Sequence, residues 1–233
     1  MRTWLERALW EVVPRDHRQT ERALRRRQLV TVAFVVVGGL VLGFSLRLEP
    51  GNVWFYPATF GLAAVWTIGA FASGPLYLGR IAAPTGPRRP VAPPILLGLA
   101  LVALFVAGAL VVREIPFLDA QVRSVLQHAD QGSGPLLVVI TAVNGIAEEL
   151  FFRGAAYAAT TRYPVPVTTL AYTIATLATG NVMLGFAAVL LGLVVGLQRR
   201  ASGGILGPIL THCTWSLSML FLLPLIFGGT PPT

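Results

Sequence analysis

Long apolar stretches, separated by short segments rich in arginine and proline, recur along the whole of this 233-residue chain. Only 12% of the residues are charged, about half of the ~25% that is usual in soluble domains. Several of the stretches reach the ~20 residues that a helix needs to cross a bilayer. These features predict an all-α polytopic membrane protein with about seven transmembrane helices.

The apolar stretches also suggest a simple domain organisation. The predicted spans are residues 28–46, 54–79, 95–112, 134–157, 164–178, 182–198 and 205–227. No connection between them is long enough to separate two domains, so residues 28–233 are expected to form a single transmembrane domain. The glycines of Gly39-x-x-x-Gly43 and the small residues Ala188, Gly192 and Gly196 indicate close helix packing.

Two further segments have amphipathic patterns. Residues 1–27 carry eight arginines and four acids. One helical face of this segment holds the apolar residues Trp4, Leu5, Ala8, Leu9, Val12 and Val13. This pattern is typical either of a basic helix lying on an anionic leaflet or of a solvated tail that sets topology. Residues 113–133 predict a second interfacial helix, in which His128 is expected to be a surface residue.

Arginine is distributed unevenly between the two sides of the predicted membrane. With the N-terminus in the cytoplasm, the inner segments hold eight arginines, then three in residues 80–94, then Arg162, Arg199 and Arg200, whereas the outer ones hold Arg47, Arg113 and Arg123. This asymmetry predicts a cytoplasmic N-terminus and an external C-terminus. It also accounts for the net charge of +8 without nucleic acid as a partner. The single cysteine, Cys213, excludes an internal disulfide.

Three charged residues interrupt the apolar stretch at 134–157, within the run Ala147-Glu148-Glu149-Leu150-Phe151-Phe152-Arg153. A carboxylate at membrane depth costs several kcal/mol unless it faces a cavity or a partner. On a helix, Glu149 and Arg153 share a face and can pair. Glu148 points about 100° away and has no local partner, which is the condition that a general base requires.

The run Glu148-Glu149-x-x-x-Arg153 resembles the first motif of the CPBP intramembrane proteases, which include CAAX prenyl protease 2 and the Abi and bacteriocin-processing proteins. The segment His212-Cys213-Thr214-Trp215-Ser216 is similar to half of the family's third motif, His-x-x-x-Asn. The second motif, Phe-x-x-x-His, falls at residues 177–181, where Asn181 stands in place of the histidine. The resemblance covers about residues 134–227.

This resemblance implies hydrolysis of peptide bonds in membrane-associated substrates, in a bacterial plasma membrane. Glu148 would be the general base that activates water. His212, with Ser216 one turn further on, would donate to the developing oxyanion. Glu149 and Arg153 would hold the helix in place.

The residue at the second-motif position, Asn181, bears on whether the protein is active and binds a metal. Asn181 can hydrogen-bond a water but cannot take up a proton, so its presence weakens the case for activity and for any metal. A divalent metal such as zinc, if bound, would use Glu148 and His212, whereas a catalytic zinc normally has three protein ligands. Helix rise places Glu148 and His212 level near the middle of the membrane, with Asn181 nearer the outer face. Thr176 or Thr179 would lie at a better depth than Asn181 to take the place of the missing histidine.

Two other functions remain open from the sequence. A catalytically silent relative could bind a membrane partner or act in bacteriocin immunity, and Asn181 is the residue that favours it over the protease. A transporter subunit could use the buried acids as a proton relay. The transporter is the weakest of the three hypotheses because the chain shows no inverted repeat of broken helices.

Overall fold

The computed structural model describes residues 3–45, 48–49, 51–84, 86–130 and 133–231, with side chains left out for 128–130. Its helices are α1 (Trp4–Leu9), α2 (Glu21–Ser45), α3 (Phe55–Ser73), α4 (Ala92–Val112), α5 (Pro116–Asp130), α6 (Gly134–Glu148), η1 (Glu149–Ala156), α7 (Tyr157–Ala159), α8 (Pro164–Leu177), α9 (Val182–Ser202) and α10 (Leu206–Phe227). The predicted positions of Arg47 and of the His128 side chain lie outside the described residues.

The helices confirm an all-α, multi-pass membrane protein. Six helical segments are long and apolar enough to cross a membrane: α2, α3, α4, the continuous run from α6 to α7, α9 and α10. The predicted span at 164–178 is present as α8, but its 14 residues are fewer than the ~17 that a membrane-spanning helix normally needs. The described part of the chain therefore has six long spans and one shorter apolar helix.

The N-terminal segment differs from the amphipathic pattern read from residues 1–27. Helix α1 ends at Leu9, and the chain then runs without helix from about residue 11 to residue 20. Pro14 explains part of this break because a proline disfavours helical backbone in the residue before it. We call residues 10–20 the strap. The first span then begins at Glu21, seven residues earlier than predicted, because the basic residues at its start form helix as readily as apolar ones.

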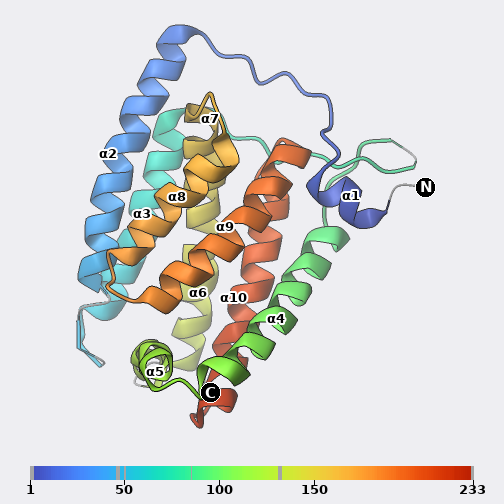
Figure 1. Cartoon of the computed structure of the whole chain (residues 1–233). Coiled ribbons are helices and arrows are strands. Elements are labelled where there is room, and N and C mark those ends of the chain that lie inside the picture. The colour runs from blue at the N-terminus through green and yellow to red at the C-terminus, as the bar shows by residue number, and fades with distance from the viewer. Residues whose placement is uncertain (1–2, 46–47, 50, 85, 131–132, 232–233) are drawn as a thin grey trace.

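The long helices form a bundle around the charged motif (Figure 1). The α6–η1–α7 run lies in the middle and packs against α3 and α10. Helices α2 and α3 pack together on one side, and α4 pairs with α10 on the other. Helices α8 and α9 pack against each other and cross the front of the bundle in this view. The charged motif is thereby enclosed by α3, α8, α9 and α10.

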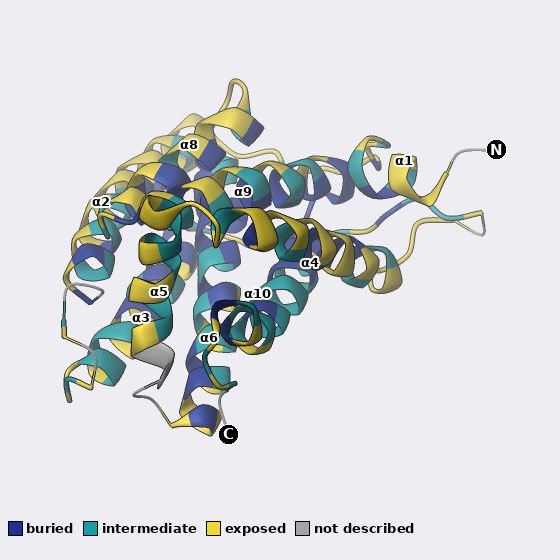
Figure 2. Cartoon of the chain, turned by 60° about the horizontal axis from the view of Figure 1, so that its bottom comes forward, coloured by how far each residue is buried: buried dark blue, intermediate teal, exposed yellow. Residues whose placement is uncertain are grey.

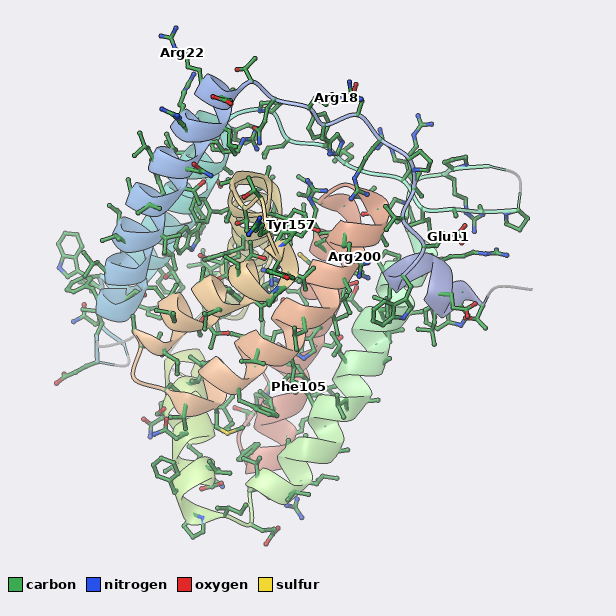
Figure 3. The ribbon with its side chains drawn as sticks, turned by 45° about the horizontal axis from the view of Figure 1, so that its top comes forward. Glu11, Arg18, Arg22, Phe105, Tyr157 and Arg200 are labelled. Carbon is green, nitrogen blue, oxygen red and sulfur yellow. The ribbon has the colours of Figure 1, made fainter. Side chains whose placement is uncertain are left out.

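Three segments far apart in the sequence meet at one end of the bundle. Arg15 of the strap donates to the carbonyl oxygen of Arg200 at 2.8 Å, and the amide of Arg80 donates to the carbonyl oxygen of Ser202 at 2.9 Å. Figure 3 looks toward this end, which we call the arginine end, whereas α5 and the C-terminus lie at the opposite end (Figure 1). The segments that the arginine count assigns to one side of the membrane thus share one end of the fold.

The outer faces of the helices carry many exposed residues (Figure 2), as expected where these residues are apolar and face lipid. Many large apolar side chains on the outer faces of α2, α3, α4 and α8 are exposed, among them Leu40, Phe71, Leu104 and Leu170. The interior holds a cluster of aromatic rings, in which Trp66 lies 4.7 Å from Phe151 and 5.0 Å from Phe152, measured between ring centroids. This cluster lies directly against the charged motif and fixes η1 in the bundle.

Candidate functional site

The charged motif lies where the fourth span changes its helical form. Helix α6 is an ordinary α-helix as far as Glu148, and residues Glu149–Ala156 then form a π-helix before α7 resumes. Such i→i+5 turns are rare and occur frequently at functional sites. Seven of the eight residues of η1 are buried. Two backbone carbonyl oxygens of this segment accept from side chains: that of Arg153 from Arg199 Nε at 2.6 Å, and that of Ala156 from Thr160 Oγ1 at 2.8 Å.

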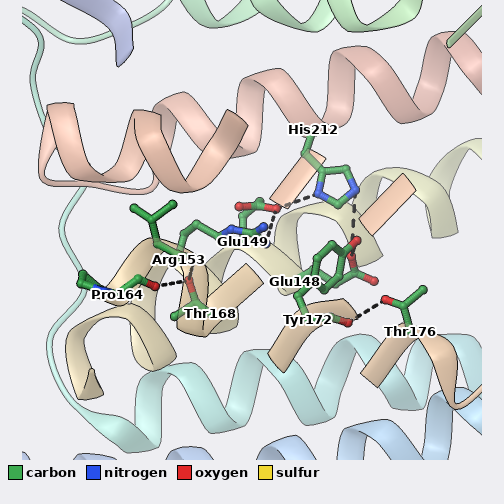
Figure 4. Close-up of polar contacts among 9 residues, drawn as sticks. Glu148, Glu149, Arg153, Pro164, Thr168, Tyr172, Thr176 and His212 are labelled. Atoms are coloured by element: carbon green, nitrogen blue, oxygen red, sulfur yellow. Dashed lines mark hydrogen bonds and ion pairs between the residues drawn. The ribbon is translucent and has the colours of Figure 1, made fainter. Parts of the chain in front are cut away.

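Glu149 is the residue that ties the cluster together (Figure 4). Its Oε1 accepts from Arg153 Nη1 at 3.1 Å and lies 2.8 Å from His212 Nδ1. Both Glu149 and Arg153 are 0% exposed. Arg153 also lies over the ring of Tyr172, 4.9 Å from its centroid, which is a favourable position for a cation. The predicted ion pair is present and is extended across the bundle to α10.

The contact with Glu149 decides which nitrogen of His212 carries the proton. An ionised carboxylate only accepts hydrogen bonds, so Nδ1 must be the donor. In neutral His212, Nε2 is therefore an acceptor with a free lone pair, and it becomes a donor only when the ring is protonated. Gly145 on α6 lies against this ring, and a Cβ there would be in ordinary van der Waals contact with it, 3.4 Å from His212 Cδ2.

Glu148 faces the other side of the same imidazole. Its Oε2 lies 4.0 Å from His212 Nε2 and accepts from the hydroxyl of Tyr172 at 2.7 Å. A separation of 4.0 Å is too long for a hydrogen bond but suits two groups that bind one water between them. Two carboxylates face one guanidinium here, so one negative charge remains when His212 is neutral, and protonation of the ring balances it.

Tyr172 is the functional candidate that the sequence reasoning missed. It lies on α8, one turn before Thr176, whose hydroxyl donates to the Tyr172 carbonyl oxygen at 2.9 Å. The depth argument pointed to this helix and to Thr176, and a tyrosine in an apolar helix normally needs a partner for its hydroxyl. The signal that could have identified Tyr172 was therefore its hydroxyl group, one helical turn before Thr176 in an apolar helix.

Asn181 is not brought into this cluster. It is the N-cap residue of α9, where its Oδ1 accepts from the amides of Met183 and Leu184, each at 3.0 Å. Its Nδ2 donates to the carbonyl oxygen of Gln121 and to Ser124 Oγ, at 2.6 and 3.2 Å. The side chain that stands in place of the family's second histidine thus starts a helix and attaches α5 to it.

Ser216 lies one turn after His212 on α10, and its hydroxyl oxygen is buried. Among the described residues this oxygen has no hydrogen-bond partner, so the structure does not join Ser216 to His212 or to either glutamate. Asn144, one turn before Glu148, donates to the carbonyl oxygen of Ile140 at 2.9 Å. The cluster is therefore made by Glu148, Glu149, Arg153, Tyr172 and His212.

The donor set of this cluster does not fit a catalytic zinc. The described residues contain no group of three or more His, Cys, Asp or Glu side chains arranged to hold a metal ion. Glu148 and His212 face each other with one oxygen and one nitrogen, while Oε1 of Glu149 is occupied by Arg153 and His212. Since three protein ligands are usual, no step of the proposed chemistry is assigned to a metal.

Comparison with known proteins bears on the part of the chain that carries these residues. Residues 130–218 match the model of the family described as type II CAAX prenyl endopeptidase Rce1-like. No curated protein and no solved structure shows a significant match to the chain. The family match confirms the resemblance drawn from the sequence: residues 130–218 of this multi-pass membrane protein are similar to the type II CAAX prenyl endopeptidases.

Proposed function

We propose that the protein is an intramembrane endopeptidase that hydrolyses peptide bonds of membrane-associated substrates. The observation that supports this most is the 4.0 Å separation of Glu148 Oε2 and His212 Nε2. Tyr172 holds Glu148 through the same Oε2, and Glu149 holds the ring of His212 through Nδ1. This arrangement suits the binding of one water between a carboxylate and an imidazole. It is built from the segment that matches the endopeptidase family.

In this proposal, Glu148 takes a proton from the water as the water oxygen attacks the substrate carbonyl carbon. The Tyr172 hydroxyl donates to Glu148 Oε2 and keeps that carboxylate directed toward His212. The same proton then passes from Glu148 to the leaving amine as the peptide bond breaks. The carboxylate is regenerated, so the cycle needs water as its only co-reactant.

Protonated His212 stabilises the developing oxyanion. The Nδ1–H bond to Glu149 orients the ring, much as a carboxylate orients a catalytic histidine in other hydrolases. The Nε2–H bond is then free to donate to the oxyanion. Arg153 neutralises Glu149, so it acts as a positioning residue. Ser216 and Asn181 have no assigned step, although both remain sequence-based candidates.

A catalytically silent relative that binds a membrane partner is the second candidate. The observation that favours it is the position of Asn181, which caps α9 and does not supply a second proton-accepting group to the cluster. The same cluster of Glu148, Glu149 and His212 would then serve only to hold the helices together.

One substitution distinguishes the two functions. Glu148→Gln preserves size and can still accept from Tyr172, but it removes proton uptake. With purified full-length protein in liposomes and a panel of membrane-anchored peptides, prenylated and unprenylated, cleavage should fall by about 10²–10⁴-fold. Glu114→Gln is the matched control, because Glu114 is an exposed carboxylate paired with Arg113. Its rate should equal that of the wild type.

Cleavage by Glu148→Gln at the wild-type rate would exclude Glu148 as the base. An absence of cleavage by the wild type across the whole panel would favour the binding protein. Thermal unfolding of both variants, measured in the same liposomes, would show that a lost rate is not a lost fold.

A further inference from the structure

A second polar site lies at the arginine end, away from the charged cluster. The strap, the start of α2, the end of α3 and the ends of α7 and α9 enclose a cavity of about 520 Å³. Its lining includes Arg15, Arg18, Arg26, Arg27, Arg199 and His17. Among the residues that the structure describes, no aspartate or glutamate lines it. Figure 3 shows Arg18 on the strap above this region and Tyr157 on the helix below.

Arg27 is the residue that makes this cavity a candidate binding site. It is only 3% exposed, and its Nε and Nη1 have no hydrogen-bond partner within the described part of the chain. Its remaining nitrogen, Nη2, donates to the carbonyl oxygen of Pro75 at 3.2 Å. An unneutralised guanidinium with two unused donors is costly to bury, so its position indicates that an anion completes the site.

The backbone around Arg27 leaves room for this guanidinium. Gly74, which follows α3, has φ of +142°, and a Cβ there would clash with Arg27 Nη2. A larger residue at position 74 would displace the group from the cavity. This glycine thus combines an unusual backbone angle with the close approach of a charged side chain.

The other cationic groups of the cavity are held largely by backbone carbonyl oxygens. Arg15 donates to Arg200 and Ala201, and Arg26 donates to Ala72. Arg18 has a weak pair with Asp16 at 3.6 Å, and both of these side chains are exposed. Burial, followed by the charges of Arg199 and Arg15, lowers the pKa of His17 below its usual range. The arginines therefore keep most of their charge available to a ligand.

We propose that this cavity binds a phosphate group, supplied either by the headgroup of an anionic phospholipid or by a free phosphate ion. Guanidinium groups recognise phosphate oxygens with paired, charge-assisted hydrogen bonds. The cavity lies where four helical segments end, which is the level of lipid headgroups for helices of this length. Basic pockets of this kind between membrane helices bind anionic headgroups.

The binding is tested with the purified full-length protein in detergent, titrated with dioleoyl phosphatidylglycerol or dioleoyl phosphatidylcholine and followed by native mass spectrometry. Phosphatidylglycerol should bind at least about ten-fold more tightly than the zwitterionic lipid. The variant Arg18→Gln with Arg26→Gln removes two exposed arginines of the lining. Each basic residue near an anionic headgroup contributes about a five-fold change in affinity, so the pair should weaken binding about 25-fold.

Arg22→Gln with Arg25→Gln is the matched control. Both arginines are exposed on the first turns of α2 but lie outside the cavity lining, so the same change in charge should weaken binding by less than about three-fold. Equal losses in the two double variants would show a general attraction to acidic lipid and would overturn the site. Thermal unfolding of each variant would show that its fold is retained.

A second arm identifies the source of the phosphate. About 10 mM inorganic phosphate is added to the lipid-bound protein. The cavity is assigned to the free ion if phosphate displaces phosphatidylglycerol from the wild type and raises the unfolding temperature of the wild type more than that of the Arg18–Arg26 variant. Retention of the lipid in the same phosphate assigns it to a headgroup. The absence of both lipid preference and any phosphate effect would overturn the proposal. None of these outcomes depends on peptidase activity.

Discussion

Arg153 and Arg27 are both buried arginines at helical positions, but their surroundings differ in kind. Arg153 lies in the middle of the bundle, 3.1 Å from the Glu149 carboxylate and over the ring of Tyr172. Arg27 lies at the arginine end, where its recorded partner is a backbone carbonyl oxygen and its neighbours in the cavity are other cations. The first charge is balanced by Glu149, whereas the second has no acidic partner in the described part of the chain.

This difference teaches how to read charges in a membrane protein. In the hydrocarbon interior an unbalanced charge is expensive, so a motif such as Glu148-Glu149-x-x-x-Arg153 must carry its own counter-charge. At the headgroup level, anionic groups outside the chain can provide it. The charged cluster therefore uses partners within the chain, whereas the arginine end is open to an anionic ligand.

The largest effect is expected from topology reporters, because each fusion lies on one side of the membrane or the other. Positive charge favours the cytoplasmic side of a membrane, so we expect the arginine end to lie in the leaflet that faces the cytoplasm. A reporter inserted in the 80–90 connection should therefore be cytoplasmic, and one fused after residue 233 should be external. The same side for both would contradict the predicted orientation and the odd number of crossings.

A comparison of Arg153→Ala with Arg27→Gln tests the difference in free energy. Removal of Arg153 leaves the Glu149 carboxylate buried without its counter-charge, at a cost of about 3–5 kcal/mol in stability. The removal of Arg27 leaves no orphaned carboxylate, so the change should stay within about 1 kcal/mol. The measurement is reversible unfolding in mixed micelles, together with the yield of folded protein.

Replacement of both Glu149 and Arg153 by apolar residues of similar volume provides the rescue. The folded yield should return toward that of the wild type, while cleavage should stay low because His212 has lost its orienting carboxylate. Equal stability of the wild type and Arg153→Ala would show that the ion pair contributes nothing. A large loss in Arg27→Gln would show that Arg27 is balanced by the chain after all.

A smaller effect, on rate alone, is expected at the two residues that flank Glu148. His212→Ala removes the proposed oxyanion donor and should lower cleavage by about 10²–10³-fold. Tyr172→Phe removes a single hydrogen bond to a charged group, worth about 1.5–3 kcal/mol, and should lower the rate less. A greater loss in Tyr172→Phe than in His212→Ala would reverse the proposed roles and make Tyr172 the donor.

The fold class could be predicted because bilayer crossing depends on the length and polarity of single segments. The spans around residues 95–112 and 205–227 differ from the observed helices by only a few residues. The strap and the short α8 could not be predicted in this way. Their lengths depend on contacts with other segments, such as those of Arg15 with residues 200 and 201, and not on their own composition.

The same limit applies to the candidate site. The pairing of Glu149 with Arg153 follows from helical spacing, and the approach of His212 follows from matched depth, so both could be inferred. The π-helix at 149–156 has no separate signature in residue type, since α- and π-turns place Glu149 and Arg153 on nearly the same face. The partners Tyr172 and Arg199 lie on other helices, and only packing brings them near.

The smallest effect is expected at Asn181, a neutral polar residue whose amide group is engaged entirely by neighbouring protein groups, in contrast to Arg27. Asn181→Ala removes the cap of α9 and the contact with α5, at a cost of about 0.5–2 kcal/mol, which differential unfolding would detect. The cleavage rate should stay within about two-fold of the wild type because the Asn181 side chain contacts the start of α9 and α5 and not Glu148. Asn181→His restores the family's residue in sequence, but the imidazole would still lie at the helix cap, so no gain in rate is expected. A clear increase in cleavage by Asn181→His would show that this part of the chain moves toward the cluster during catalysis and that the second-motif position belongs to the site.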